Sequence, residues 1–258
     1  MIIKEKILRT NVYKKLLEIK QNGAGYFCLL DPDKQDVSKS IDLALGCEQN
    51  GADAILIGGS MMLKENFIVS IKEIKKNTSI PVIIFPGIFN FVSPDADALL
   101  LLSMLSSRNP QMLIGEQVRA APLIKSYNLE SIGTAYLLIE SGNITSVQYM
   151  SHSLPIPRKK NDIAVAHALA GEYLGMKMVY LEGGSGALES VPESMIAEVS
   201  NAISVPLIVG GGIRTPEVAY NKVRAGADFV VTGTILEEEC SFSKINEFAQ
   251  AIHEAGRK

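Results

Sequence analysis

The amino-acid sequence predicts an α/β fold, a modified (β/α)8 barrel of the TIM type in which one crossover helix is missing or replaced by an extended segment. Short apolar, β-branched runs alternate with helical patterns along the chain, and eight such runs are present. Most runs end at a glycine or a proline, as expected of parallel strands that feed right-handed crossovers. One crossover is too short for a helix. Eight parallel strands close a barrel more naturally than they spread into an open sheet.

The expected elements follow one another in a regular order. Strands are predicted at residues 26–30, 52–57, 80–85, 98–102, 132–139, 177–181, 206–209 and 228–231. Helices are predicted at residues 2–22, 37–50, 62–76, 112–127, 162–174, 192–202, 216–225 and 242–255. Apolar residues at helical spacing indicate the first helix, and Pro192 and Pro216 stand where proline is preferred, in a first helical turn. The triplet Gly-Ala-Asp precedes two strands, at 51–53 and 226–228, which indicates either barrel pseudo-repetition or coincidence.

Three segments depart from this rhythm. Only ten residues, 88–97, separate the third strand's Pro-Gly end from the fourth strand, whereas a crossover helix needs a dozen or more. Residues 145–149 are expected to pair back on the preceding strand as a hairpin after the turn at 141–143. Residues 152–160 contain two prolines and three basic side chains, and we expect a loop that acts as a lid.

Composition restricts the class of protein. The 258 residues suit one barrel domain, 1–258, and 47% hydrophobic residues suffice for a sizeable core. A net charge of −3 leaves no basic footprint for nucleic acid. Cys28, Cys47 and Cys240 show neither disulfide nor metal spacing and are expected to be buried thiols in a reducing cytoplasm. No signal peptide or membrane span is evident, although a greasy substrate would bring the chain to a membrane surface.

Three strand ends break abruptly into glycine, within residues 180–187, 209–214 and 231–234. Glycine leaves backbone N–H groups unshielded by a Cβ atom, so an anionic oxygen approaches them closely. In many (β/α)8 barrels the loops after the seventh and eighth strands hold phosphate. The series therefore predicts a phosphate cup.

Asp31 and Ser60 end the first and second strands and should be neighbours across the barrel mouth. A carboxylate beside a hydroxyl offers hard oxygen ligands, which suit Mg²⁺ shared with phosphate oxygens and water. Alternatively, Asp31 caps the following helix or anchors the Asp-Pro turn, which is the commoner role of such a residue.

Glu182 follows Tyr180 by two residues, so both side chains lie on one face of the strand, expected to be the interior of the mouth. A carboxylate in a phosphate site is suited to accept a proton from a substrate hydroxyl. A structural salt bridge to Lys177 or Arg214 is the equal alternative.

Further polar residues stand at strand ends and in loops. Asp33, Ser185 and Arg214 also end apolar runs, whereas Lys34, Lys159 and Lys160 are expected to be solvated. Of the three histidines only His152 stands near the expected site, and no hydrolase triad is visible.

Several motifs together resemble the geranylgeranylglyceryl phosphate synthase family, with its bacterial heptaprenylglyceryl phosphate synthases. They are Leu-Asp-Pro-Asp-Lys at 30–34, Gly-Gly-Ser at 58–60, Tyr-Leu-Glu-Gly-Gly-Ser-Gly-Ala at 180–187, Val-Gly-Gly-Gly-Ile-Arg at 209–214 and Thr-Gly-Thr at 232–234. The third is close to diagnostic, while the fourth is shared by many phosphate-binding barrels. The match runs from about residue 26 to 237. The resemblance also implies a barrel lacking one regular helix.

The resemblance implies transfer of a polyprenyl group from its diphosphate to the 3-hydroxyl of sn-glycerol 1-phosphate, with Mg²⁺ and release of diphosphate. It implies Asp31 and Ser60 as metal ligands and Glu182 and Tyr180 as catalytic residues, Glu182 being the base. The glycerol phosphate site would comprise Tyr180, Leu181, Glu182, Gly183, Gly184, Ser185, Gly186, Gly211, Gly212, Gly233 and Thr234.

The donor and the assembly follow from the same resemblance. Leu29 stands where some members have a lysine two residues before the first aspartate. The form Leu-Asp-Pro-Asp-Lys at 30–34 resembles the larger subgroup, in which geranylgeranyl is the usual donor. The tail would occupy an apolar groove along residues 88–92, 99–105 and 136–138, unless these runs are core. The family commonly forms dimers or hexamers.

Two other functions compete with this one. An isomerase or cyclase of amino-acid biosynthesis would explain the glycine turns at 210–214 and 233–234, but not residues 180–187 or the Asp31–Ser60 pair. A non-catalytic oligomeric scaffold would keep the fold alone.

Overall fold

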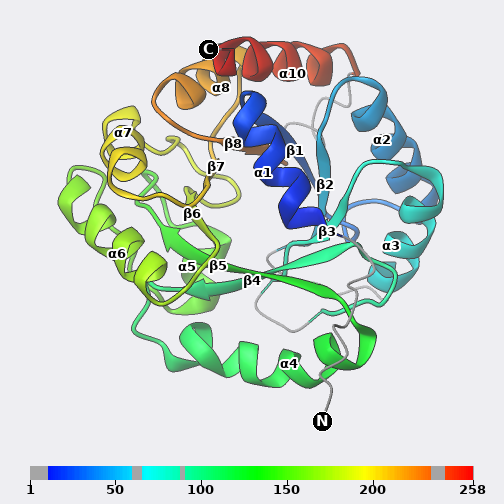
Figure 1. Ribbon diagram of the computed structural model, residues 1–258, viewed down its shortest axis with the longest axis horizontal. Helices are drawn as coiled ribbons and strands as arrows, with labels where there is room; N and C mark the ends of the chain where they lie inside the picture. The colour runs from blue at the N-terminus through cyan, green and yellow to red at the C-terminus, as the bar shows by residue number, and fades with distance from the viewer. Residues whose placement is uncertain (1–10, 60–65, 88–90, 234–241, 258) are drawn as a thin grey trace.

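The computed structural model describes residues 11–59, 66–87, 91–233 and 242–257, and these contain eight parallel strands that close into a barrel in chain order (Figure 1). The strands are β1 Gly25–Leu30, β2 Ala54–Ile57, β3 Val82–Ile84, β4 Ala98–Met104, β5 Glu130–Leu138, β6 Met178–Glu182, β7 Leu207–Gly210 and β8 Phe229–Thr232. The barrel closes where β1 pairs with β8, with Tyr26 opposite Val230. The predicted barrel and all eight predicted strands are confirmed.

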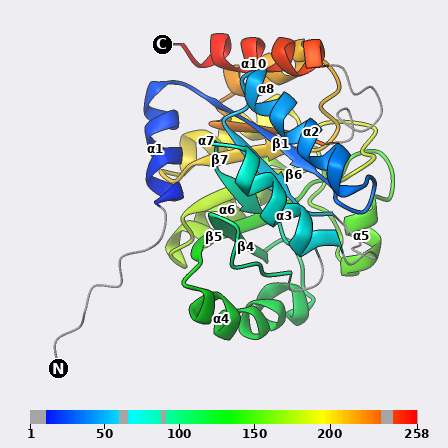
Figure 2. The same ribbon diagram turned by 90° about the vertical axis from the view of Figure 1, so that its right-hand side faces the viewer.

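Helices form a ring outside the strands (Figures 1 and 2). The described helices are α1 Val12–Asn22, α2 Val37–Gln49, α3 Asn66–Asn77, the π-helical turn η1 Gln111–Gly115, α4 Glu116–Tyr127, α5 Ser146–Ser151, α6 Asn161–Tyr173, α7 Glu193–Ala202, α8 Pro216–Arg224 and α10 Phe242–Gly256. Helix α8 starts as predicted, with Pro216 in its first turn and the Thr215 hydroxyl accepting from the Val218 N–H. Pro192 instead precedes α7 as its N-cap residue.

Of the two irregular segments considered next, the missing crossover helix is as predicted and the hairpin is not. Between β3 and β4 the described residues contain no helix, which confirms the missing crossover helix. The predicted hairpin at 145–149 is wrong, because this segment forms helix α5. Thr145 precedes the helix with extended backbone, a geometry that starts a helix as readily as it continues a strand.

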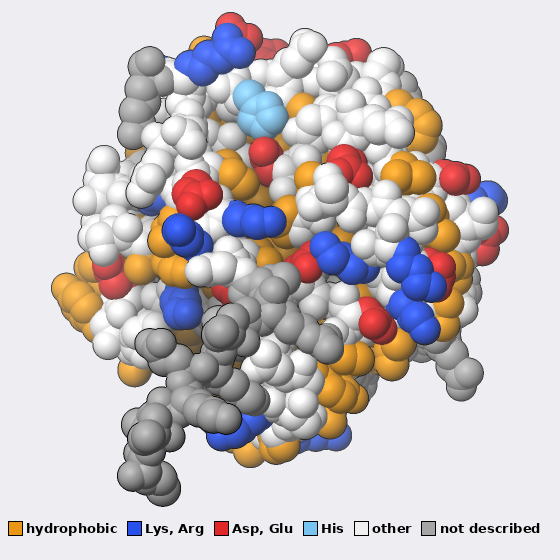
Figure 3. All heavy atoms as spheres, turned by 45° about the vertical axis from the view of Figure 1, so that its right-hand side comes forward, with side chains coloured by type: hydrophobic (Ala, Val, Ile, Leu, Met, Phe, Trp, Pro, Cys, Tyr) orange, Lys and Arg blue, Asp and Glu red, His pale blue; other side chains and the backbone are white. Residues whose placement is uncertain are grey.

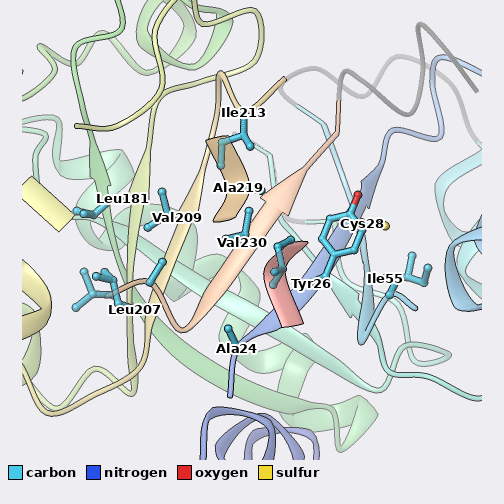
Figure 4. Close-up of a cluster of buried hydrophobic side chains, with 14 of the residues drawn as sticks. Ala24, Tyr26, Cys28, Ile55, Leu181, Leu207, Val209, Ile213, Ala219 and Val230 are labelled. Carbon is cyan, nitrogen blue, oxygen red and sulfur yellow. The ribbon is translucent and has the colours of Figure 1, made fainter. Parts of the chain in front are cut away.

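Side chains alternate between two layers along each strand. On β6, Tyr180 points into the barrel, whereas Val179 and Leu181 point outward, into the layer between strands and helices. Figure 4 shows Leu181, Val209 and Val230 in this outer layer. The period of two therefore puts residue 182 back inside the barrel.

Helix α1 lies across the end of the barrel where the strands begin (Figure 1). Its Val12 and Leu16 pack with the interior side chains. Its first N–H groups are satisfied by Glu130 at the start of β5, whose two carboxylate oxygens accept from Val12 at 2.7 Å and Tyr13 at 3.0 Å. The end of the barrel where the strands begin is thus closed. The carboxyl ends of the strands lie at the opposite end.

Three aspartates tie neighbouring strands together at the closed end. Each directly precedes a strand and accepts a backbone N–H at the preceding strand: Asp53 from Tyr26 (2.7 Å), Asp97 from Val82 (2.9 Å) and Asp228 from Leu207 (2.8 Å). Each also contacts a basic side chain: His253, Lys75 and Lys20, respectively. The aspartates of the two Gly-Ala-Asp triplets therefore share one structural role.

We expect the His253–Asp53 contact to make folding stability pH-dependent. The 2.8 Å hydrogen bond with Asp53 raises the pKa of His253 above 6.5, although burial acts in the opposite direction. The stabilisation of the folded state by this contact is therefore complete below about pH 6.5. It is lost as the pH rises through the folded-state pKa of His253. In thermal unfolding, His253→Asn should lower the midpoint more at pH 6 than at pH 8.5. His152→Asn, at an exposed residue, is the control. Equal losses at both pH values would contradict the expectation.

The surface is mixed in charge. On the face in Figure 3, Lys and Arg side chains alternate with Asp and Glu side chains. None of the described helices has the length and apolarity to span a bilayer. Cys28 and Cys47 are buried, as predicted, and are not in a disulfide, while Cys240 lies outside the described residues.

Candidate active site

A cavity of about 530 Å³ opens where the strands end, opposite the end closed by α1. All three glycine turns line it, through Gly184 after β6, Gly211 and Gly212 after β7, and Gly233 after β8. Their meeting in one cavity supports the predicted cup, because strand ends of a parallel barrel point to the same rim.

Two of these glycines are required by backbone conformation and close packing. Gly211 has φ +83° and Gly212 φ +70°, in the left-handed region that favours glycine. A Cβ atom at Gly211 would lie 2.6 Å from the Gly184 backbone nitrogen and 2.5 Å from Glu182 Oε1. The turns after β6 and β7 therefore touch, and any side chain at this position would fill their junction.

Glu182 is the last residue of β6 and faces the cavity, with 6% of its surface exposed. Its Oε1 accepts the Gly184 N–H at 2.6 Å, and the Tyr180 hydroxyl also hydrogen-bonds to the carboxylate. None of the ion pairs between described residues includes Glu182. Lys177 lies over the Tyr13 ring, and Arg214 donates to backbone carbonyls instead. The salt-bridge alternative is therefore wrong for the described residues.

Burial raises the pKa of Glu182 to about 7, and the bonds from Gly184 and Tyr180 only partly oppose this effect. Burial, and the nearby carboxylate, raise the pKa of Tyr180 well above its ordinary value, so the phenol keeps its proton. A carboxyl group that ionises near neutral pH is suited to accept a proton at that pH.

Three aromatic rings cluster in the cavity. The ring of Tyr180 is 5.5 Å from that of Tyr136 and 5.6 Å from that of Phe85, and all three residues line the cavity. A Cβ atom at Gly210 would lie 2.3 Å from the Tyr180 hydroxyl, so glycine makes room for this phenol. The same cavity also has an apolar part.

The apolar part is formed by β4 and the helix that follows it. Its lining includes the predicted Val92, Leu99, Leu101, Leu102 and Met104. Met112, Gln117 and Ala120, from η1 and α4, also line it. The sequence does not indicate that these last three line a cavity, because a helix pattern identifies the faces of a helix but not whether a face meets the core or a cavity.

Asp31 also lines the cavity, with Asp33 and Lys34. Its Oδ1 accepts the Asp33 N–H at 3.0 Å, so the predicted anchoring of the Asp-Pro turn is present. A Cβ atom at Gly59 would lie 2.6 Å from Asp31 Oδ2, which brings the end of β2 against the carboxylate. The close approach between the first two strand ends is as predicted, while Ser60 itself lies outside the described residues.

The predicted site residues separate into three groups. Those that line the cavity are Asp31, Tyr180, Glu182, Gly184, Ser185, Gly186, Gly211, Gly212 and Gly233. Leu181 and Gly183 do not line it: the Leu181 side chain packs in the outer layer, and the Gly183 N–H bonds to Gly210 O at 2.9 Å. Ser60 and Thr234 lie outside the described residues.

The predicted lid makes no contact with the cavity. Ile156 forms a parallel bridge with Ile139 beyond β5, and none of residues 152–160, all of which are described, lines the cavity. His152, the histidine nearest the predicted site, is exposed.

Comparison with known proteins decides the family. The model of the PcrB family matches residues 16–252, which is most of the chain. This chain belongs to the PcrB family. Similar relatives include proteins named geranylgeranylglyceryl phosphate synthase: that of Chitinophaga pinensis is 44% identical, covering 96% of this chain and 98% of its own. That of Methanosphaera stadtmanae is 42% identical, covering 94% and 100%. The resemblance seen in the motifs is therefore confirmed.

A solved structure agrees with this family. The (S)-3-O-geranylgeranylglyceryl phosphate synthase from Thermoplasma acidophilum, in complex with its substrate sn-glycerol-1-phosphate, superposes on this PcrB-family chain with a TM-score of 0.91 and 35% identity. The likeness covers 95% of this chain and 99% of that protein. The barrel of the family is thus preserved along nearly the whole chain.

Proposed function

We propose that this chain transfers a polyprenyl group from its diphosphate to the 3-hydroxyl of sn-glycerol 1-phosphate and forms an ether lipid precursor. One observation carries the proposal: a single cavity unites a glycine-lined cup, a buried carboxyl group with a pKa of about 7, and an apolar region. A phosphorylated acceptor and a long apolar donor need this combination. The relatives' names and the glycerol phosphate complex of the similar structure support it.

The site residues divide the chemistry between them. The backbone of Gly211, Gly212 and Gly233 binds the phosphate of the acceptor. Glu182 accepts the proton of the 3-hydroxyl as that oxygen bonds to C1 of the prenyl group. The bond between C1 and the diphosphate oxygen breaks, and diphosphate leaves with the electron pair. The rings of Tyr136 and Tyr180 face this region and favour positive charge on the allylic carbon.

The residues at the end of β1 fit a magnesium ion. Mg²⁺ is usually held by one or two carboxylates, substrate phosphate oxygens and water rather than by a full protein cage. This agrees with the described residues, which include the cavity-lining carboxylate of Asp31 but no cluster of three or more acidic, histidine or cysteine ligands. Asp31 would hold the ion, with Ser60 as the predicted second ligand. The ion would neutralise charge on the leaving diphosphate.

Asp31→Asn tests the metal assignment. We expect the Mg²⁺ concentration for half-maximal activity to rise about tenfold or more, because an amide binds a hard cation less strongly than a carboxylate. The measurement is a magnesium titration of the initial rate. Asp42→Asn, on the exposed face of α2, is the matched control. An unchanged titration would remove Asp31 from the metal site.

The nature of the tail follows from the cavity and from the motif at residues 30–34. We propose geranylgeranyl diphosphate as the donor, with the tail along β4 and α4. Incubation with radiolabelled sn-glycerol 1-phosphate and a ladder of prenyl diphosphates, followed by extraction of lipid product, tests both reaction and chain length. Preference for a ribosyl phosphate would favour the isomerase or cyclase, and absence of saturable binding would favour the scaffold. Cytoplasmic location, homo-oligomers and transient contact with a membrane surface stay predictions.

A further inference from the structure

The segment between β6 and α7 is held by four side chains from other parts of the chain. Its carbonyl oxygens accept, in order, from Asn143 at Gly186 (3.2 Å), Arg214 at Ala187 (2.6 Å) and Leu188 (3.0 Å), Arg158 at Ser190 (2.9 Å), and Lys222 at Val191 (2.7 Å). Three of the four donors are cationic. Five backbone carbonyls of this one loop thus accept hydrogen bonds from side chains.

This segment forms part of the cup and supports the rest of it. Gly184, Ser185 and Gly186 line the cavity. Further along, a Cβ atom at Gly212 would lie 2.8 Å from the Ser190 nitrogen and 3.0 Å from the Glu189 carbonyl oxygen. The backbone at 189–190 therefore packs directly against one of the glycines assigned to the phosphate, and its position determines where that glycine lies.

Arg158 makes the most connections among these donors. Its Nη1 donates to Ser190 O and also to Glu140 O at 3.1 Å, and its Nε lies 2.7 Å from Glu189 Oε2. Its own backbone N–H donates to Glu140 Oε2 at 3.2 Å. The guanidinium thus joins the end of β5 to residues 189–190. Arg158 does not line the cavity, so it has no direct contact with a molecule there.

A loop that binds an anion must present amides and keep carbonyl oxygens away, because the carbonyl carries partial negative charge. Side chains that donate to the carbonyl oxygens favour that orientation before any ligand arrives. If the competent conformation is populated by only a fraction of molecules, the apparent dissociation constant rises by the inverse of that fraction. The planar guanidinium of arginine can donate to several acceptors at once and so restrain the loop in this conformation. The single ammonium group of lysine cannot reproduce that geometry.

We propose that Arg158 is a positioning residue for the phosphate cup: it holds residues 189–190 against Gly212 and so prepares the cup for the phosphate of the acceptor. The inference rests on the proposed function, since it assigns the cup to glycerol phosphate. Arg214 is a poorer probe because it lines the cavity itself. Lys222 is only 1% exposed and also contacts Glu193, so its removal tests folding.

Arg158→Ala should raise KM for sn-glycerol 1-phosphate about tenfold, as expected if about a tenth of the molecules keep the competent loop. We expect kcat and KM for the prenyl diphosphate to stay within about twofold. Binding of sn-glycerol 1-phosphate and of inorganic phosphate, measured by calorimetry without donor, should weaken in parallel. Arg158→Lys should recover only part of the affinity.

Lys159→Ala is the matched control, because it removes an exposed positive charge from the next residue. Its KM should equal that of the unmodified chain. Unchanged glycerol phosphate affinity in Arg158→Ala, an equal loss in Lys159→Ala, or full recovery in Arg158→Lys would each overturn the inference. A uniform loss that includes kcat and donor affinity would also overturn it, as a general folding defect. If the unmodified chain binds neither phosphate ligand, the proposed function fails and this inference with it.

Discussion

Replacing Glu182 by glutamine should lower the rate of prenyl transfer by about 10²–10⁴-fold, the usual effect of removing a general base. Glutamine keeps an oxygen that accepts the Gly184 N–H, so the turn after β6 should stay in place. Glycerol phosphate binding should therefore change little. The measurement is single-turnover transfer together with calorimetric binding. Glu217→Gln, at an exposed residue of α8, is the control.

The same carboxyl group predicts opposite effects of pH on activity and stability. With a folded-state pKa of about 7, kcat/KM should fall as the pH drops below 7, since the base becomes protonated. In the unfolded chain the carboxyl ionises near its ordinary value of 4.5. Stability is therefore lost as the pH rises from about 4.5 through 7, by roughly 3 kcal/mol in total.

Glu182→Gln should remove this penalty. At pH 8 the variant should melt at a higher temperature than the unmodified chain, while near pH 4.5 the difference should vanish. A variant that loses activity and stability together at pH 8 would contradict this account, and unchanged transfer kinetics would remove Glu182 from the role of base.

Gly211→Ala should abolish detectable binding of glycerol phosphate, the second large effect. The new methyl group would lie 2.5 Å from Glu182 Oε1 and 2.7 Å from the Gly183 nitrogen, where the turns after β6 and β7 meet. One of the two turns must move, and the amides assigned to the phosphate move with it. We expect the dissociation constant to rise by at least about 100-fold, or roughly 3 kcal/mol.

The control for this change is Gly175→Ala. Gly175 has φ +84°, nearly the same as Gly211, but no heavy atom of the described residues lies within 4 Å of a Cβ atom there. Both variants pay a backbone penalty of about 1–2 kcal/mol for an L-residue in the left-handed region. Only Gly211→Ala should lose binding. Equal binding in the two variants would show that the crowding at Gly211 has no functional consequence.

Much of the fold was predictable because local pattern carries it. Strand and helix periods, together with glycine at the strand ends, located all eight strands, and the short crossover before β4 identified the missing helix. The segment at 145–149 was misassigned because a few residues after a tight turn fit a strand or a short helix equally well. Tertiary packing decides that this segment forms helix α5 rather than a strand.

The site was predictable to the extent that strand alternation determines it. A period of two placed Tyr180 and Glu182 inside the barrel, and the same rule explains why Leu181 lies outside the cavity. The family motif covers a continuous run of residues and does not separate the two faces. Met112 and Ala120 were not predicted to line the cavity because only the packing of η1 and α4 against β4 brings them there.

The sequence by itself determined the barrel, the family and the residues at the strand ends, since these depend on periodicity and on short continuous motifs. Only the tertiary structure decided that Glu182 lacks a cationic partner among the described residues and ionises near pH 7, and that Arg158 reaches the loop after β6. Both properties depend on which distant segments meet around a group. Burial and hydrogen bonding between such segments arise only when the barrel closes.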